Sequence, residues 1–401
     1  MELKPGYKQT EVGAIPEDWE ITTVGDAFEI HNTLRFPISN AVRETMPGPY
    51  PYYGPTSIQG YINEYRVEGE YALIGEDGDH FLKWQTQPMT LLVQGKFNVN
   101  NHAHLVRGTK NLTSWFYYYF SRRDLAPFLT RQGASRYKLT KKKLAALPCA
   151  IPARNAEQAA IAQALSDADA LIESLDQLIA KKRQIKQGAM QELLTSKRRL
   201  PGFSGEWEVK RLADLADIRS GGTPSTAQPQ FWDGGVKWCT PTDITALDGF
   251  KYLSNTARTI SAEGLKASSA EIIPKHSIVM TSRATIGECA INTVPMTTNQ
   301  GFKNFVPFDS VDAEFLYYLL TTQRAGFIGL CSGSTFLEIG KTQLSGYQVQ
   351  VPKTKSEQTA IATILSDMDT ELAALESRLA KARQLKQGMM QELLTGRIRL
   401  L

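Results

Sequence analysis

The sequence predicts an α+β protein made of two similar halves, each a globular block followed by one long helix. Two observations support this prediction. The 39 residues that begin at Glu157 return at Glu357, with 23 identities and no gap. Each copy lacks proline and has a single glycine, Gly188 or Gly388, as a long helix requires. The offset of 200 residues is too long for a solenoid repeat, so the chain is interpreted as a twofold reader of a two-part target.

The repeat extends weakly into the globular blocks. An aromatic stretch that starts at Trp115 faces a similar stretch from Phe315 at the same offset, and both blocks open on a tryptophan, Trp19 or Trp207. Two related scaffolds with different surfaces suit a reader of two different half-sites. The sequence therefore divides into a first block, a first helix, a second block and a second helix, over residues 1–151, 152–197, 198–351 and 352–401.

Both helical segments carry apolar residues at the alternating four-three spacing that is typical of coiled coils. Because these seams are the only matching ones in the chain, the two helices are expected to pair with each other. Lys186 and Lys386 interrupt the seams at equivalent positions. They either reach solvent from a frayed seam, or lock its register, or contact a partner. The positions expected to pair the helices and contact partners are Ile161, Leu165, Ile172, Leu175, Ile179, Ile361, Leu365, Leu372, Leu375 and Leu379.

Composition restricts the classes of protein that fit. The chain has no apolar run of the ~20 residues that a membrane span needs, and its first residues form no apolar signal, so no membrane partner is expected. The four cysteines are scattered without a CxxC pair, which disfavours a zinc ribbon and favours a reducing cytoplasm. His102 and His104 share one face of a strand, but no third ligand is evident, so no metal is expected.

A basic stretch in the first block indicates nucleic-acid binding. Residues 107–143 contain ten Lys or Arg and one acid, whereas the preceding 106 residues contain seven basic and fourteen acidic groups. Cations that match phosphate spacing give affinity by counterion release. The lysine run from Lys141 also fits a solvated loop or a helix start, and Tyr117 to Tyr119 fit the core of a helix better. The candidate DNA contacts in this block are Lys96, Asn100, Asn101, Arg131, Arg136 and Lys138.

In the second block the candidates lie in glycine-containing loops. Arginine reads guanine through two hydrogen bonds, and asparagine or glutamine reads adenine, so these residue types suit base edges. Each signal is weak by itself, since Arg283 could simply pair with an acid and Asn299 could simply cap a turn. The candidates are Gly222, Thr223, Arg283, Asn299, Gln300 and Ser334.

These features together resemble the specificity subunit of a type I DNA restriction-modification system. Both helices show the opening PxxxxEQxxIAxxLSDxD and the closing KQGxMQELLT, and the blocks open on PEDW and GEW. The first block adds PYYGPTSIQGYI and GKFNVNNHAH, and the second adds SGGTP, TSRATIG and TTNQGF. The resemblance covers essentially the whole chain.

The resemblance implies two mixed α/β target-recognition domains separated by an antiparallel coiled coil of two long helices, with pseudo-twofold symmetry that brings the C-terminus near the N-terminus. Each domain would read one half of a split, asymmetric site in double-stranded DNA. The implied protein partners are two modification subunits, which methylate adenine with S-adenosylmethionine, and two restriction subunits, which translocate and cut DNA. S-adenosylmethionine and ATP are therefore expected on the partner subunits, and no cofactor is expected on this chain.

The motifs of the corresponding enzymes are missing from the sequence. It has no Pro-Pro dipeptide for an adenine methyltransferase motif, no GxGxxG fingerprint and no GxxxxGK[ST] phosphate loop, so no catalytic residue is expected. One alternative is the specificity subunit of a methylation-only or phage-defence complex. A coiled-coil scaffold without DNA contact is a further alternative, which the salt dependence of DNA binding would distinguish.

The helices are also expected to set the gap between the two half-sites. Four residues inserted after Leu194 would lengthen a helix by roughly 6 Å and rotate its end by about 40° beyond a full turn. One base pair turns DNA by about 34–36°, so the gap should lengthen by one base pair.

Overall fold

The computed structural model describes residues 5–132, 136–331 and 337–400. The chain forms two compact units. The first comprises residues 1–176 and 377–401, and the second comprises residues 177–376. Each unit therefore combines one globular block with part of both long helices.

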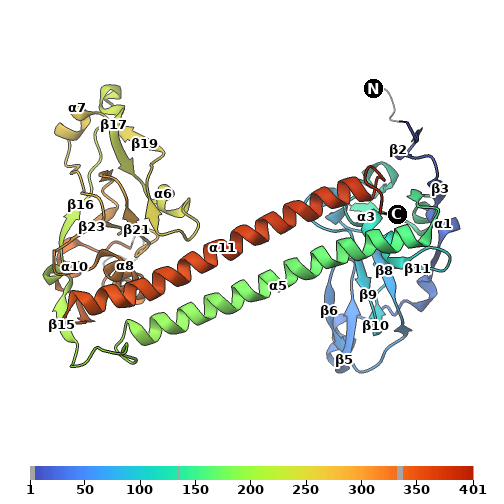
Figure 1. Ribbon diagram of the computed structural model, residues 1–401, viewed down its shortest axis with the longest axis horizontal. Coiled ribbons are helices and arrows are strands. Elements are labelled where there is room, and N and C mark those ends of the chain that lie inside the picture. Colours follow the sequence, from blue (N-terminus) through green and yellow to red (C-terminus); the bar gives the residue numbers. More distant parts are fainter. Residues whose placement is uncertain (1–4, 133–135, 332–336, 401) are drawn as a thin grey trace. The chain divides into compact units, whose positions relative to one another are not determined.

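The two long helices are α5 (Asn155–Leu193) and α11 (Lys355–Leu393), each of 39 residues. Figure 1 shows both as continuous helices, α5 in green and α11 in red. Leu194 lies beyond the end of α5 and is buried in the core of the second unit. An insertion after Leu194 would therefore not lengthen the helix, and the insertion that the sequence suggested has to be placed elsewhere.

Within each unit the two helices run antiparallel. In the first unit, Lys386 of α11 contacts Asp169 of α5, and Arg383 contacts Asp176. The residue numbers of the paired positions thus decrease along α11 as they increase along α5, as they do in an antiparallel pair. The second unit repeats these contacts at the corresponding positions of the sequence repeat, with the pairs Lys186–Asp369 and Arg183–Glu376.

The domain of the first unit contains two four-stranded sheets. The antiparallel sheet has the order β4 (Phe28–Ile30), β11 (Ala103–Gly108), β8 (Tyr71–Gly75) and β9 (Thr90–Val93). The other sheet has the order β6 (Ile58–Ile62), β5 (Pro47–Tyr53), β10 (Lys96–Val99) and β7 (Val67–Glu68), with β10 parallel to β5. The smaller pairs are β1 (Tyr7–Thr10) with β2 (Gly13–Pro16), β3 (Glu20–Thr23) with β14 (Pro148–Ile151), and β12 (Thr130–Gln132) with β13 (Arg136–Lys138). The short helices are α1 (Val24–Ala27), α2 (Asn40–Glu44), α3 (Thr113–Ser121) and α4 (Lys141–Ala145).

Both long helices contribute to the core of this domain. Trp19, at the block entrance, packs edge-on against Trp115 of α3 with ring centroids 5.4 Å apart. The same buried cluster contains Ile161 and Leu165 of α5 and Leu393 of α11. Burial of these apolar side chains ties the helix ends to the domain.

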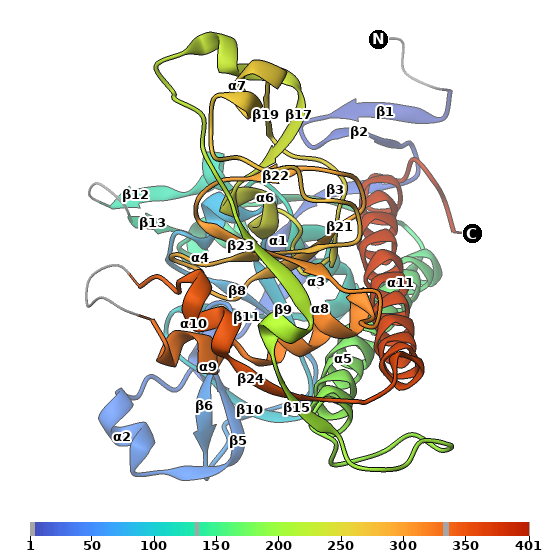
Figure 2. The same ribbon diagram turned by 90° about the vertical axis from the view of Figure 1, so that its left-hand side faces the viewer.

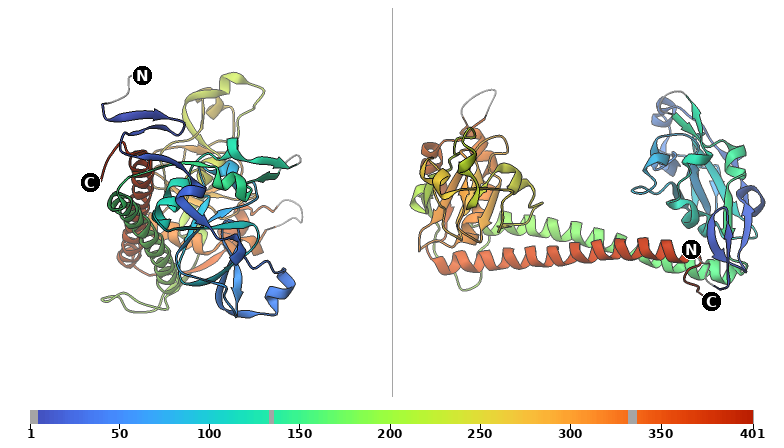
Figure 3. Two further views of the ribbon diagram at one scale, coloured as in Figure 1. Left: turned by 90° about the vertical axis from the view of Figure 1, so that its right-hand side faces the viewer. Right: turned by 90° about the horizontal axis from the view of Figure 1, so that it is seen from above.

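The two ends of the described chain meet in the first unit. The β1–β2 hairpin, dark blue in Figure 3, lies beside the C-terminal end of α11, and the Tyr7 hydroxyl donates to the carbonyl of Gly396 at 2.8 Å. The guanidinium of Arg399 binds Asp18 at 2.8 Å. The expected proximity of the two terminal segments is thereby confirmed.

The domain of the second unit, whose strands are labelled in Figure 2, also contains two larger sheets. Its larger sheet has the order β16 (Ala216–Ser220), β23 (Phe302–Pro307), β20 (Ile278–Thr281), β21 (Cys289–Asn292) and β18 (Tyr252–Leu253). The second sheet has the order β19 (Arg258–Ile260), β17 (Trp232–Cys239) and β22 (Thr297–Thr298), with β22 parallel to β17. β15 (Glu208–Arg211) pairs with β24 (Gln348–Val351). The short helices are α6 (Pro241–Thr245), α7 (Ala262–Lys266), α8 (Ala313–Thr322), α9 (Arg324–Gly329) and α10 (Lys341–Gly346).

The expected fold class is confirmed. Each domain contains a sheet with four antiparallel strands, to which the second domain adds β18 in parallel with β21. Each domain also has a second sheet that contains one parallel pair, and each is followed by a long helix. The corresponding strand orders, together with the ion pairs that recur at corresponding positions of the two long helices, show that the two units are structural repeats of each other. Within the described ranges, no helix is both long enough and apolar enough to cross a bilayer.

Candidate nucleic-acid interface

In the second unit, five of the six candidate residues gather where β16, β20 and β22 end. The Thr223 hydroxyl contacts the side-chain carbonyl of Gln300. The amide of Gly222 donates to the Thr298 carbonyl at 2.9 Å, which holds the loop after β16 against the end of β22. The cluster arises because the antiparallel register places the end of β16, the start of β23 and the end of β20 at one edge of the sheet. The sixth candidate, Ser334, lies outside the described residues.

Gly222 has a packing role in this cluster. A Cβ at this position would lie 2.4 Å from the backbone nitrogen of Ala270, and the Gly222 carbonyl accepts a hydrogen bond of 2.9 Å from the Trp238 indole. A larger residue would force the two loops apart. Gly222 therefore allows the close approach that positions Thr223.

Asn299 and Gln300 occupy the turn between β22 and β23. The side-chain oxygen of Asn299 accepts from the backbone nitrogen of Gly301 at 2.9 Å, so this residue does cap a turn. Asn299 is half-buried, whereas Gln300 is exposed. The turn thus presents Gln300 at the surface beside Thr223.

Arg283, in the connection after β20, pairs with an acid, as one of its two interpretations anticipated. Its Nε atom lies 2.9 Å from a carboxylate oxygen of Glu338, and the two side chains are 47% and 39% exposed. An ion pair this open to water contributes little to stability, about 0–1 kcal/mol. The location of Arg283 in the polar cluster is therefore stronger evidence about its role than its small contribution to the stability of the fold.

A buried lysine that none of the sequence motifs indicates lies beneath this cluster. Lys303 of β23 is 6% exposed, and burial lowers the pKa of its ammonium although the charge of Glu338 opposes that shift. The hydroxyl of Ser282 is also buried, and the described residues offer it no hydrogen-bond partner. The sequence does contain a signal for the burial of this lysine, because Lys303 stands between the apolar residues Phe302 and Phe305 of a strand.

In the first unit, the equivalent region centres on the carboxylate of Glu76. It accepts from Arg35 at 2.5 Å and lies 3.2 Å from the ammonium of Lys138. Burial would raise the pKa of Glu76, but the hydrogen bonds from Arg35 and Lys138 outweigh it and hold the pKa below its usual value. Arg35 also donates to the Asn101 carbonyl at 3.0 Å, which brings the candidates Asn101 and Lys138 into one network.

Two other candidates lie apart from each other at opposite ends of β10. Lys96 begins the strand, is exposed, and places its ammonium 4.6 Å from the centre of the Tyr65 ring. Asn100 follows the strand and is buried. Its amide donates to Gln59 at 3.1 Å and accepts from the His102 backbone at 2.8 Å, so both ends of the amide bind within the domain.

The remaining first-block candidates belong to the β12–β13 hairpin. Arg131 is exposed and faces Tyr137 in the strand register. Arg136 begins β13, but its side chain, like residues 133–135, lies outside what the structure describes. The lysine run is a helix start, because Thr140 caps α4 by accepting from the Lys143 backbone. Tyr118 and Tyr119 are buried in α3, so the interpretation of this stretch as helix core is confirmed.

The histidine pair does not form a ligand set in the described structure. His102 lies at the surface against Asp77, with Nδ1 3.0 Å from its carboxylate. His104 is fully buried, donates from Nε2 to the Leu139 carbonyl at 2.6 Å and faces the Asn32 amide at 2.8 Å through Nδ1. Among the described residues, no group of three or more His, Cys, Asp or Glu is placed to hold a metal ion.

The seam positions of the long helices are largely buried. Ile161 and Leu165 lie in the core of the first domain, and Ile361 and Leu365 lie in the core of the second. Ile172 and Leu372 are half-buried. The positions nearer the middle of the helices, with 5–8% exposure, are Leu175, Ile179, Leu375 and Leu379.

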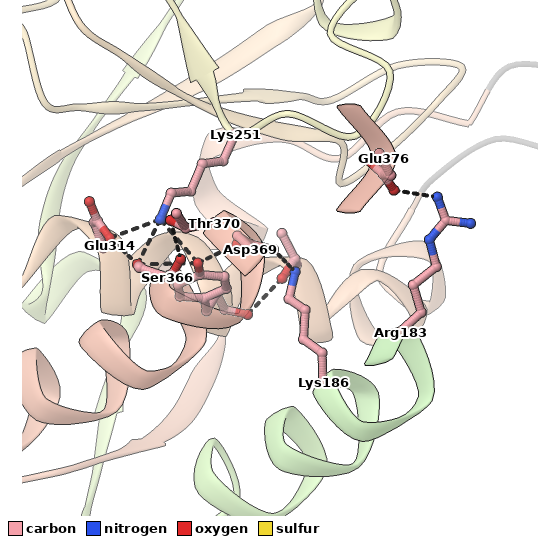
Figure 4. A network of polar contacts seen from close by, with 10 residues as sticks. Arg183, Lys186, Lys251, Glu314, Ser366, Asp369, Thr370 and Glu376 are labelled. Atoms are coloured by element: carbon pink, nitrogen blue, oxygen red, sulfur yellow. Dashed lines mark hydrogen bonds and ion pairs between the residues drawn. The ribbon is translucent and has the colours of Figure 1, made fainter. Parts of the chain in front are cut away.

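A second polar network joins the second domain to α11 (Figure 4). The buried ammonium of Lys251 lies 2.9 Å from Glu314 of α8 and 2.7 Å from the Ser366 hydroxyl of α11. Burial would raise the pKa of Glu314, but hydrogen bonds from Ser366, Tyr252 and Lys251 lower it below its usual value. These contacts fix the domain on its helix.

Two domains of one topology, with different polar side chains in equivalent loops, define a two-domain recognition protein. The family model for the type I restriction modification DNA specificity domain matches residues 16–184 and 204–384. The chain belongs to this family, and the resemblance inferred from its motifs is confirmed.

Individual relatives support the same assignment. The chain is 39% identical over 166 residues to the type I restriction enzyme MjaIX specificity subunit of Methanocaldococcus jannaschii, an alignment that covers 41% of the chain and 38% of that relative. The chain thus spans less than half the length of this relative. It is 25% identical over 381 residues to the EcoR124I/EcoR124II specificity subunit of Escherichia coli, covering 90% of the chain and 86% of that protein.

Solved structures share the fold. The S subunit of a type I restriction-modification system from M. genitalium has a TM-score of 0.64 at 15% identity, with 98% of each chain covered. A chain from a structure that addresses complex assembly and conformational transition of the type I restriction-modification system has a TM-score of 0.53 at 16% identity, covering 96% of this chain and 99% of that one.

Proposed function

We propose that this chain is the sequence-specific DNA-binding subunit of a type I restriction-modification enzyme, and that its two domains read the two halves of a split, asymmetric site. One observation carries the proposal: the domains share their topology but differ in the side chains that their equivalent loops present. Arg283, Gln300 and Thr223 form the polar loop cluster of the second domain, while Glu76 and Lys138 take part in that of the first. Different surfaces on one scaffold suit two different half-sites.

We propose that catalysis resides on partner subunits. The sequence lacks the methyltransferase, dinucleotide and phosphate-loop motifs, so S-adenosylmethionine and ATP would bind to two modification and two restriction subunits that this chain recruits. The relatives named as type I restriction enzyme subunits support such an assembly. A cytoplasmic location suits the four cysteines, which are all free thiols. A methylation-only or phage-defence complex is the alternative, since it needs the same DNA-reading chain without a nuclease.

Sequencing of methylated adenines in cells with and without this chain tests the proposal. A two-part motif should appear only when the chain is present. Replacing residues 1–151 or 198–351 with the corresponding block of a relative should change one half of the motif and leave the other intact. If both halves changed together, the two domains would not read independently.

Two further measurements separate the alternatives. Calorimetry of the purified, partner-free chain should detect no stoichiometric binding of S-adenosylmethionine. DNA affinity should fall steeply with salt, because cations of the recognition domains displace counterions from phosphates; affinity insensitive to salt would favour a scaffold role. Loss of transformation by unmethylated plasmid would indicate a restriction enzyme, and methylation without that loss would indicate the methylation-only alternative.

A further inference from the structure

The connections after β8 and β20 occupy equivalent places in the two domains. In the first domain, Glu76 donates its backbone N–H to the His102 carbonyl at 2.7 Å and accepts from the Leu139 N–H at 2.7 Å. The second domain repeats both bonds, at 2.7 Å and 3.1 Å, with a corresponding set of three residues: Ser282, Gly301 and Ile339. This correspondence aligns the two connections residue by residue.

The next residue in each connection forms an isolated antiparallel bridge. Asp77 bridges to Lys138 in the first domain, and Arg283 bridges to Glu338 in the second. The correspondence therefore sets Asp77 against Arg283 and Lys138 against Glu338. At both positions of the bridge, one domain has an acid where the other has a base.

Beneath each bridge lies a buried residue, and this residue is a base in both domains. His104 lies opposite Ile74 in the sheet, two residues before Glu76, and Lys303 lies opposite Met280, two residues before Ser282. Both inner residues are buried bases, whose pKa is lowered by burial. The sign of the charge thus reverses at the bridge, whose side chains reach the surface, while a buried base lies below it in both domains.

The geometry of Arg283 suits base recognition. Its ion pair with Glu338 uses Nε, and the side chain is 47% exposed. A guanidinium carries five N–H donors in a fixed plane, so a contact through Nε fixes the plane while the terminal nitrogens can face a ligand. Guanine is the base that offers two adjacent acceptors, O6 and N7, in the major groove. Thr223 and Gln300 lie at the same edge of the sheet.

We propose that Arg283 reads a guanine in the half-site bound by the second domain, and that Glu338 is the residue that positions its guanidinium. This inference rests on the proposed DNA-reading function. In the first domain the corresponding bridge residue, Asp77, offers only acceptors, which suit the amino group of cytosine or adenine and repel the acceptor edge of guanine. The reversed bridge thereby gives the two domains different base preferences on one scaffold.

The test uses the full chain assembled with its modification subunits. Bound duplexes are selected from a random pool, and affinities are then measured for every single-base change in the selected site. The wild-type complex should prefer guanine by roughly 5- to 150-fold at one position of the second half-site, as expected for a bidentate contact. Replacing that guanine with 7-deazaguanine, which lacks the N7 acceptor, should weaken binding of the wild type and leave Arg283→Ala unaffected.

Three variants separate reading from charge and folding. Arg283→Ala should lose the preference at that position and keep the first half-site unchanged. Arg283→Lys retains the charge without the planar fork, so its preference should be weaker than that of the wild type but stronger than that of Arg283→Ala. The double variant Arg283→Glu with Glu338→Arg keeps an ion pair, so it should fold and yet lose the guanine preference. Arg211→Ala is the matched control, because Arg211 is an exposed arginine of the same domain that pairs with Asp214, 2.9 Å away.

Three outcomes would overturn the inference. An unchanged selected site in Arg283→Ala shows that this residue reads no base. Equal weakening on all sequences, with the salt slope reduced by about one, assigns Arg283 to a phosphate. A guanine preference that the double variant keeps shows that the bridge does not set specificity. A wild-type complex that selects no sequence at all refutes the proposed function itself, and this result is distinct from the other three.

Discussion

Lys186 of α5 directs its ammonium onto the carboxylate of Asp369 of α11 (Figure 4). The hydroxyl of Tyr318, from α8 of the second domain, donates to the other oxygen of the same carboxylate. The first unit repeats the arrangement at the corresponding positions, with Lys386, Asp169 and Tyr118. The seam lysines are therefore not simply directed to solvent. Each joins the two helices to the recognition domain of its unit, which supports their interpretation as register locks.

This arrangement predicts measurable coupling between Lys186 and Asp369. The two side chains are 23% and 28% exposed, so screening is incomplete, and a double-mutant cycle with Lys186→Met and Asp369→Asn should give roughly 0.5–1 kcal/mol. Hydrogen exchange in the C-terminal half of α5 provides the local opening free energies. The more exposed pair Lys182–Glu371 is the control and should couple more weakly. A Lys186 coupling no larger than that of the control would contradict the register lock.

A second prediction concerns Arg399, whose guanidinium binds the carboxylate of Glu157 at 2.8 Å. The Glu157 side chain is 1% exposed, whereas that of Arg399 is 22% exposed. Arg399→Met would leave a buried carboxylate without its cation, so the first unit should lose stability near the lower end of roughly 3–5 kcal/mol. Adding Glu157→Gln removes the buried charge and should recover part of the loss. Urea unfolding followed by hydrogen exchange at the start of α5 measures both, and a double variant no more stable than Arg399→Met would refute the buried-charge explanation.

The helices were predictable from sequence because their signals are local. The periodicity of the seams and the repeated opening and closing motifs predicted two long helices. The apolar context of Tyr117 to Tyr119 predicted that these tyrosines belong to a helix in the core. The loop sites were harder, because their geometry depends on partners distant in the sequence. Asn100 is buried against Gln59, and the Lys138 charge is shared with Glu76. Residue type alone could not reveal these contacts.

The charge-reversed bridge is a second feature that residue type alone could not reveal. Arg283 was selected as a candidate by its chemistry, but its counterpart Asp77 was not, because their correspondence appears only when the two domains are aligned through backbone hydrogen bonds. The offset between the two copies is constant along the helices but changes across the loops. A fixed offset in sequence would therefore have missed the correspondence between Asp77 and Arg283.

A third prediction follows from the buried imidazole of His104. Burial lowers its pKa from 6.5, although the hydrogen bond to the Leu139 carbonyl opposes the shift, and the neutral ring accepts from the Asn32 amide. The unfolded chain therefore takes up this proton first as the pH falls below about 6.5, so the folded state loses stability until the lower folded pKa is reached. The unfolding temperature of the first unit should fall between pH 7.5 and 5.5, and His104→Gln should reduce that slope. An unchanged slope would assign the pH dependence to other groups.

The last prediction rests on the proposed function and concerns the gap between the two halves of the proposed split site. Both long helices pass from one unit to the other, α5 between Asp176 and Gln177 and α11 between Glu376 and Ser377. Four residues inserted at both points leave every ion pair within a unit in place. They add roughly 6 Å and about 40° beyond a full turn to each helix.

One added base pair rotates DNA by about 34–36° and advances it by about 3.4 Å. The rotation of the insertion matches one base pair, whereas its length would suit nearly two. A rotational mismatch turns a reading surface away from its groove, whereas bending of DNA or protein can absorb a few ångströms. The methylated motif should therefore gain one base pair in its gap while both half-sites stay unchanged. The control insertion, after Lys197 and outside α5, should leave the gap as it was. Methylome sequencing of the two variants decides the matter, because an active enzyme with an unaltered gap after the helix insertions would show that the helices do not set the spacing.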